Sequence, residues 1–220
     1  MVVGTGTEVG KSWVGAAFLA ACRADGITVK ARKPAQSYVL GQGPTDAEVL
    51  GAASGEDAFT VCPPHRWYEA PLAPPMAAEE LGRPSFTIDH LIGELGWPKR
   101  HASLGLVETA GGVASPQASD GDGTDLIRML DPDWVLLVAD AGLGVINAVR
   151  LSVSALISAQ PATVRHLLVV LNRFDPDSAL HRRNLRWLSE TDGFDVVTSP
   201  VSDPFSCGRS LLRRIVWARS

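Results

Sequence analysis

The chain has 220 residues, of which 45% are hydrophobic and 20% charged, values typical of a globular protein rather than of a disordered or fibrous one. Its formal net charge of −4 excludes a strongly basic protein that binds nucleic acid or anionic membranes through charge alone. A chain of this length can bury one full core, so we expect a single domain over residues 1–220.

Neither the cysteines nor the apolar runs indicate export or membrane insertion. Cys22, Cys62 and Cys207 are widely spaced and form no CxxC pair, which favours neither a disulfide framework nor a zinc site. No apolar run reaches the roughly 18 residues that a membrane span requires, and the N-terminus lacks the basic and apolar segments of a signal peptide. We therefore expect a cytoplasmic protein.

The first predicted elements are a short strand, a glycine-rich loop and a helix. Apolar residues 1–3 lead into GTGTEVGKS, which runs from Gly4 to Ser12, and apolar residues then recur at helical spacing over residues 11–23. Backbone amides of such a loop bind phosphate, while Lys11 reaches the terminal phosphates and the Ser12 hydroxyl ligates Mg²⁺. In the usual form of the loop a glycine stands where this chain has Thr5. The context nevertheless favours phosphate binding over an ordinary glycine-rich turn.

The rest of the chain alternates between apolar strands and amphipathic helices. The pattern predicts strands over residues 28–34, 104–108, 134–140, 166–172 and 195–199, and helices over residues 46–53, 88–95, 145–158, 178–189 and 207–217. Continuous apolar strands that alternate with helices are typical of a parallel sheet covered on both faces. Residues 62–84 contain many prolines, so we expect this segment to lie on the surface and not to form regular structure along its whole length.

Polar residues follow several predicted strands at their carboxyl ends, where ligands bind in folds of this type. Lys33, Glu108, Asp140 and Asn172 have this position, and Asp46 opens a helix after a loop. A carboxylate here could hold Mg²⁺ together with water and phosphate oxygens. The alternatives are that Asp46 is only a first-turn acid and that Lys33 is a solvated strand end.

Several stretches, taken in chain order, resemble the motifs of one enzyme family. They are GTGTEVGKS at residues 4–12, KPAQS at 33–37, TDAEVL at 45–50, VETAGG at 107–112, LGVINA at 143–148 and Asn172. In order and spacing they are similar to the motifs of the dethiobiotin synthetases, which close the ureido ring in biotin synthesis. The match spans about residues 1–175 and is loose beyond them.

The resemblance implies an α/β fold of the P-loop NTPase type, with a mostly parallel sheet and helices on both faces. It implies that ATP and Mg²⁺ drive the carboxylation and ring closure of 7,8-diaminononanoate with CO₂. Lys11 would then bind the β- and γ-phosphates, Lys33 the carbamate and the transferring phosphoryl group, and Thr7 would act beside them. The implied nucleotide contacts are Gly6, Thr7, Glu8, Val9, Gly10, Lys11, Ser12 and Asn172, and the implied metal ligands are Ser12, Asp46 and Glu108.

The same resemblance implies where the diamine binds. Its reacting end would meet Ser37, Ala110, Gly111 and Gly112, and its carboxylate tail would meet Leu143, Gly144 and Asn147 of a second subunit. This implies a homodimer. From the residues alone, the turn at 143–147 is equally an ordinary glycine-containing entry to a helix.

Departures from the family pattern concern the substrate more than the reaction. Thr109 stands where glycine is usual, Tyr38 follows Ser37 where glycine is common, and Ala148 follows Asn147 where histidine is frequent.

The base is a separate question, because NRFD at residues 172–175 resembles the Asn-Lys-x-Asp element that reads guanine in many GTPases. Asp175 would suit guanine, Asn172 alone would suit adenine, and the family resemblance favours ATP. Two other functions stay open at this point, a cobyrinate-type amide-forming enzyme and a nucleotide-dependent switch ATPase.

Overall fold

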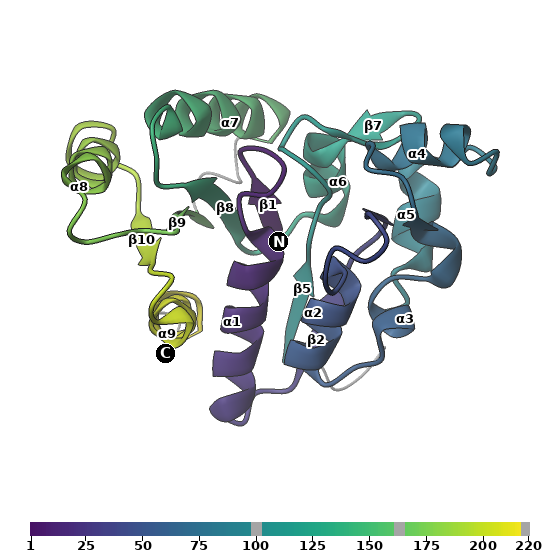
Figure 1. Cartoon of the computed structure of the whole chain (residues 1–220), viewed down its shortest axis with the longest axis horizontal. Coiled ribbons are helices and arrows are strands. Elements are labelled where there is room, and N and C mark those ends of the chain that lie inside the picture. Colours follow the sequence, from purple (N-terminus) through teal and green to yellow (C-terminus); the bar gives the residue numbers. More distant parts are fainter. Residues whose placement is uncertain (98–102, 161–165, 217–220) are drawn as a thin grey trace.

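The computed structural model describes residues 1–97, 103–160 and 166–216, which form a central parallel sheet with helices on both faces (Figure 1). The strands are β1 (Val2–Gly4), β2 (Val29–Arg32), β5 (Leu104–Val107), β8 (Val135–Asp140), β9 (Leu167–Asn172) and β10 (Val196–Ser199). A bridge between Val2 and Glu108 places β5 beside β1, so the strand order across the sheet is β2-β5-β1-β8-β9-β10. Every pairing among these strands is parallel, and the predicted mostly parallel α/β fold is confirmed.

Neighbouring side chains on each strand enter two different cores because strand side chains alternate between the faces of a sheet. Val2 of β1 packs on the face covered by α1 (Lys11–Ala24), α2 (Asp46–Ser54) and α9 (Pro204–Ile215). Val3 packs on the opposite face, against α6 (Gly123–Leu130) and α7 (Val145–Ala159). Burial on both faces explains why the strands read as continuous apolar runs.

A third, smaller core lies beside the β2 edge of the sheet, on the right in Figure 1. It joins helices α4 and α5 to two short strand pairs, β3 with β4 and β6 with β7. The bounds are β3 (Gln36–Ser37), α3 (Ala58–Val61), a 3₁₀ turn (Pro64–Arg66), β4 (Trp67–Tyr68), α4 (Pro74–Glu80), α5 (Ile88–Glu94), β6 (Pro116–Ala118) and β7 (Gly121–Asp122). Hairpin β6–β7 also supports one wall of the candidate site.

Three predicted segments differ from the structure. Residues 62–84 were expected to lie on the surface without regular structure along their whole length; their regular elements, which include α4, are indeed interrupted, but Tyr68 and Ala77 are buried. Pro74 and Pro75 are compatible with α4 because they occupy its first turn, where proline's missing N–H costs no helical bond. The helix expected over 178–189 is α8 (Ala179–Arg186) followed by a π-helical turn (Trp187–Thr191).

The helix expected over residues 207–217 begins earlier, at Pro204, where Asp203 accepts a hydrogen bond from Ser206 N–H and caps it. Trp217 lies outside the described residues. The other predicted helices and strands agree with the structure to within two residues at each end, including the strand expected over residues 28–34, which ends at Arg32.

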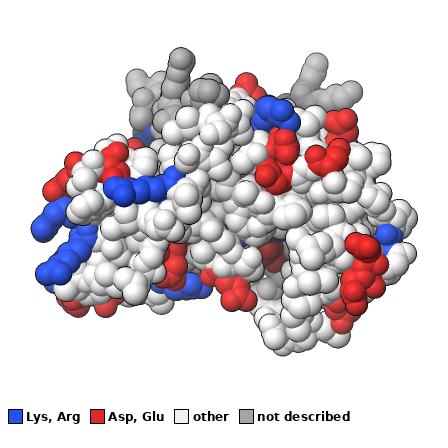
Figure 2. Space-filling model, turned by 90° about the horizontal axis from the view of Figure 1, so that it is seen from above, with Lys and Arg blue, Asp and Glu red and all other residues white. Residues whose placement is uncertain are grey.

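Charged side chains of both signs are interspersed over the face seen from above in Figure 2, with more basic ones at the left end and more acidic ones at the right. This mixture fits the small net charge, and the expectation that nucleic acid is not a partner stays a prediction. Among the described residues, no helix combines the length and apolar character that crossing a membrane requires.

Candidate active site

The loop between β1 and α1 has the backbone geometry of an anion-binding turn. Glu8 and Gly10 both adopt left-handed conformations, with φ of 59° and 91°. Gly10 precedes α1 without a side-chain cap, so amides of the first helical turn are left for a ligand. Lys11 folds back over the loop, and its Nζ donates to the Gly6 carbonyl at 3.1 Å. Burial, together with the nearby charge of Lys33, lowers the pKa of Lys11 to about 8.

Residues from the end of β9 hold this loop in place. The buried Asn172 side chain donates from Nδ2 to the Val9 carbonyl at 2.9 Å. A Cβ at Gly10 would lie 2.0 Å from Asn172 Nδ2, so only glycine fits there. Arg173 adds a second contact, donating to the Glu8 carbonyl at 2.7 Å while pairing with Asp140 at 2.7 Å. Asn172, which was expected to contact the base, thus uses its donor group to support the loop.

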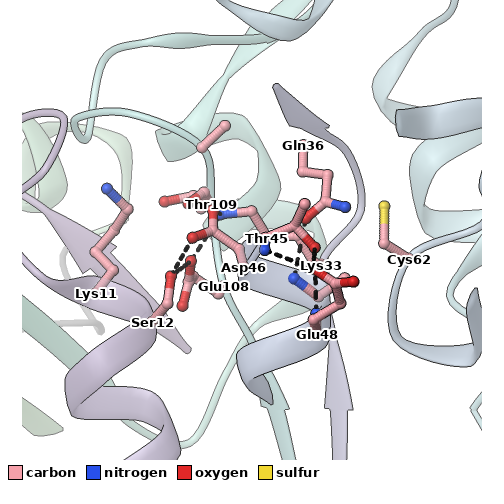
Figure 3. Close-up of polar contacts among 12 residues, drawn as sticks. Lys11, Ser12, Lys33, Gln36, Thr45, Asp46, Glu48, Cys62, Glu108 and Thr109 are labelled. Atoms are coloured by element: carbon pink, nitrogen blue, oxygen red, sulfur yellow. Dashed lines mark hydrogen bonds and ion pairs between the residues drawn. The ribbon is translucent and has the colours of Figure 1, made fainter. Parts of the chain in front are cut away.

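Four side chains from four separate elements converge beside the loop (Figure 3). Ser12 comes from α1, Asp46 from the start of α2, and Lys33 and Glu108 from the residues that follow β2 and β5. Ser12 Oγ lies 2.5 Å from Asp46 Oδ1 and 2.8 Å from Glu108 Oε1. Lys33 Nζ lies 2.7 Å from both Asp46 Oδ2 and Glu108 Oε1, and it donates to the Thr109 carbonyl at 3.1 Å. The structure therefore brings together all four of these predicted residues.

Burial and mutual charge fix the protonation of this cluster. Burial acts to lower the pKa of Lys33, but Asp46 and Glu108 outweigh it and raise the pKa above the usual lysine value. Burial likewise opposes ionisation of Asp46, yet Lys33 and the Ser12 hydroxyl lower its pKa to about 2. Burial is the largest influence on Glu108 and raises its pKa. Lys33 is accordingly a charged group, suited to stabilise negative charge rather than to accept a proton.

The cluster fits a magnesium ion that also binds phosphate. Ser12, Asp46 and Glu108 present oxygen atoms, the ligands that Mg²⁺ prefers. Glu108 Oε2 is buried and has no hydrogen-bond partner among the described residues. Those residues include no group of three or more His, Cys, Asp or Glu side chains that could hold a metal by themselves. A site with few protein ligands is what Mg²⁺ uses when phosphate and water complete its shell.

A cavity of about 620 Å³ opens in front of the phosphate loop. Its lining includes Thr7, Lys33, Ser37, Ala110 and Gly111. The phosphate loop and three of the expected substrate residues therefore share one cavity. The expected residue Gly112 is not part of the lining, and an added Cβ there would lie 3.4 Å from Gly6 Cα.

The expected residues for the substrate tail lie elsewhere. Leu143, Gly144 and Asn147 are not part of the lining, and Leu143 is 92% exposed. Their expected role, which was assigned to a second subunit, stays a prediction.

Sequence reasoning missed much of the cavity lining. An apolar wall is formed by Trp13, Tyr38, Val39, Leu72 and several prolines, and Ser115 adds a hydroxyl near Gly111. Gln117 was not predicted either, although its side chain forms hydrogen bonds with the backbone of Ala110. Serine and glutamine at these positions match no motif, so nothing in the sequence marked them.

Comparison with known proteins gives a consistent result. A protein-family model described as an AAA domain matches residues 1–199. A protein of Anaeromyxobacter dehalogenans named ATP-dependent dethiobiotin synthetase BioD is 38% identical over 80% of this chain and 77% of its own length. Proteins of the same name from Haloferax mediterranei and Rhodococcus jostii are each 36% identical over 90% of this chain, covering 82% and 84% of their own lengths.

Proposed function

The chain belongs to the family of ATP-dependent dethiobiotin synthetases, and from that premise we propose that it converts 7,8-diaminononanoate, CO₂ and ATP to dethiobiotin, ADP and phosphate. One observation carries the proposal. The buried ammonium of Lys33 is held between Asp46 and Glu108 at the wall of the cavity that the phosphate loop also lines. A fixed cation beside a phosphate site suits a reaction in which anions form and transfer phosphate.

The reaction proceeds in three steps. An amine of the substrate attacks CO₂, forms an N–C bond and loses a proton, which gives a carbamate. A carbamate oxygen attacks the γ-phosphorus of ATP, and the bond from that phosphorus to the bridging oxygen breaks and releases ADP. The second amine then attacks the carbonyl carbon of the mixed anhydride, loses a proton and expels phosphate, which closes the ring. Negative charge develops or moves in each step, so fixed cations and amides supply most of the catalysis.

Lys11 and Lys33 divide this task. Lys11 binds the β- and γ-phosphates from its place over the loop, and phosphate charge favours its ammonium form although its pKa is lowered to about 8. Lys33 faces the carbamate and the transferring phosphoryl group. Thr7 lines the cavity with them, and Gly6, Glu8, Val9, Gly10 and Asn172 shape the nucleotide site.

Ser12, Asp46 and Glu108 are the residues that would hold Mg²⁺. The ion would neutralise phosphate charge on the nucleotide. Because Lys33 already pairs with both carboxylates, it and the ion would share them. Glu108 Oε2 accepts no hydrogen bond from any described residue.

The diamine binds at Ser37 and residues 110–112, and the internal contacts of this segment limit which amides can take part. Ala110 N–H donates to Gln117 Oε1 at 2.9 Å and Gly112 N–H donates to Ser115 Oγ at 2.8 Å. Among the described residues, nothing accepts a hydrogen bond from Gly111 N–H, so this amide is the one offered to substrate.

The proposal includes a homodimer in the cytoplasm. The exposed turn at Leu143, Gly144 and Asn147 would receive the substrate carboxylate of the other subunit, at the start of α7 where backbone amides favour an anion. Cys22, Cys62 and Cys207 are free and buried, which suits a reducing compartment. The cobyrinate-type and switch-ATPase alternatives are not favoured, since the relatives named above share a different activity.

The test is incorporation of labelled bicarbonate into an acid-stable product by purified protein with Mg²⁺, ATP and 7,8-diaminononanoate. Label that depends on each component supports ring-closing carboxylation. Absence of label in a protein that binds ATP would overturn the proposal and leave only the nucleotide site.

A further inference from the structure

Gln117 makes an unusual set of contacts for a residue that no motif includes. It lies in β6, and its side chain is buried, with 3% of the residue exposed. Its Oε1 accepts from Ala110 N–H at 2.9 Å, and its Nε2 donates to the carbonyls of Ala110 at 2.7 Å and Ser115 at 3.0 Å. One carboxamide therefore pairs with both backbone groups of Ala110, as a neighbouring strand would.

These contacts reach Lys33 through a single peptide group. The carbonyl of Thr109 accepts from Lys33 Nζ at 3.1 Å, and the N–H of the same peptide belongs to Ala110 and donates to Gln117. Because a peptide group is planar, its N–H and its carbonyl cannot turn independently. Fixing the N–H on one side thus fixes the direction of the carbonyl that holds the lysine ammonium on the other.

We propose that Gln117 is a positioning residue that orients the Thr109–Ala110 peptide and, through it, the ammonium of Lys33. The inference rests on the proposed function, in which Lys33 stabilises the carbamate and the transferring phosphoryl group. It goes beyond that function because Gln117 itself does not line the cavity. Without the carboxamide, the peptide is free to rotate, and Lys33 loses the acceptor that complements its two carboxylate partners.

Two variants separate orientation from general damage. Gln117→Leu keeps the size of the side chain and removes all three hydrogen bonds. Gln117→Glu keeps the acceptor for Ala110 N–H but places its second oxygen against the carbonyls of Ala110 and Ser115. A buried carboxylate in that position is disfavoured, so its pKa rises, and its protonated form again offers a donor to these carbonyls. Ser119→Ala is the matched control, because Ser119 follows β6 and donates to the Phe86 carbonyl without touching residues 109–112.

The closing experiment measures kcat, nucleotide affinity and unfolding on these variants. For Gln117→Leu we expect kcat to fall at least about tenfold, with the Kd for ATP within about twofold of the parent. For Gln117→Glu we expect kcat relative to the parent to recover as pH falls from about 8 to about 6. A kcat of Gln117→Leu close to that of the parent, or a pH-independent ratio for Gln117→Glu, would overturn the inference.

A double-mutant cycle keeps the inference independent of the proposed function. Gln117→Leu and Lys33→Met are combined, and the free energies of unfolding of the parent, both single variants and the double variant are compared. Losses that are smaller together than their sum support coupling through the shared peptide, and additive losses contradict it. The cycle gives its answer even if the parent forms no dethiobiotin, so failure of the proposed function and failure of this inference are distinguishable.

Discussion

Two loops lie side by side along the cavity, and they are held in place in different ways. The phosphate loop is supported from across the sheet, since Asn172 reaches the Val9 carbonyl from 163 residues away and Arg173 reaches the Glu8 carbonyl from 165 residues away. The loop at residues 109–112, which is the proposed substrate loop, is supported mainly by its near neighbours Ser115 and Gln117, in addition to contacts from Val2 and Lys33 to Thr109. A recognisable motif can thus depend on remote residues for its shape, while near neighbours that belong to no motif can support another loop.

Lys33 is connected to both loops. It bonds to the Thr109 carbonyl of the substrate loop, and through Asp46 and Glu108 it is linked to Ser12 at the end of the phosphate loop. Perturbations can therefore be ranked by whether they affect both loops, the phosphate loop alone, or one exposed contact.

The largest effect is expected from Lys33→Met, which removes the cation shared by the two loops. We expect kcat to fall at least about a hundredfold, because a fixed charge beside the transferring phosphoryl group is lost. Stability should fall by about 3–5 kcal/mol, because Glu108 is left as a buried carboxylate without its cation. Steady-state kinetics and chemical unfolding measure the two effects.

The control for Lys33 is Lys30→Met on β2, the strand that Lys33 follows; the half-exposed ammonium of Lys30 pairs with Glu56 outside the cavity. Lys30→Met should change both quantities little. Comparable losses in the two variants would show that Lys33 has no special place between the loops.

The next effect is expected from Asn172→Leu, which loosens only the phosphate loop. Removing the donor to the Val9 carbonyl leaves a loop peptide unsupported, so the affinity for ATP should fall about tenfold. Titration calorimetry measures this affinity. Asn184→Leu is the matched control, because Asn184 is also buried and donates to the carbonyls of Ala141 and Gly142, away from the phosphate loop. Equal losses of ATP affinity in both variants would contradict a specific support role for Asn172.

The pH dependence of ATP affinity tests the protonation of Lys11 in the phosphate loop and leaves the substrate loop unchanged. The pKa of Lys11 is lowered to about 8 in the free protein, and phosphate binding favours its charged form, so ATP binding takes up a proton near this pH. Affinity for ATP should be highest below pH 8 and about tenfold weaker at pH 9. Lys11→Arg stays charged throughout this range, and its affinity should not vary with pH. A flat profile for the parent would show that Lys11 is already fully charged before ATP binds.

The smallest effect is expected from Arg173→Ala, because the pair between Arg173 and Asp140 is about half exposed on both sides. Exposed pairs contribute up to about 1 kcal/mol, so ATP affinity should fall by at most about fivefold. Arg150→Ala removes another half-exposed arginine, which pairs with the more buried Asp192 and does not contact the loop, and it should leave affinity unchanged. A tenfold or larger loss for Arg173→Ala would rank it with Asn172 as a main support of the loop.

Most of the main sheet and its helices could be predicted because both depend on local patterns. Apolar runs indicated β8 and β9, and helical spacing indicated α1 and α7. Helix α4 could not be predicted because prolines at the first turn of a helix and prolines in a loop look alike in sequence. The π-helical turn after α8 left no sequence pattern that distinguished it from a longer α-helix.

The candidate site likewise has features that the sequence predicts and features that it does not. The amino-acid pattern was enough to predict the phosphate loop and to propose Lys33, Asp46 and Glu108, because these residues stand at strand ends and helix starts that the fold gathers at one edge of the sheet. The pairing of Lys33 with both carboxylates, and the hydrogen bonds from Gln117 to the neighbouring peptide, became visible in the folded chain alone. A residue's type depends on the sequence, whereas its pKa and its hydrogen bonds depend on burial and on partners brought from distant positions.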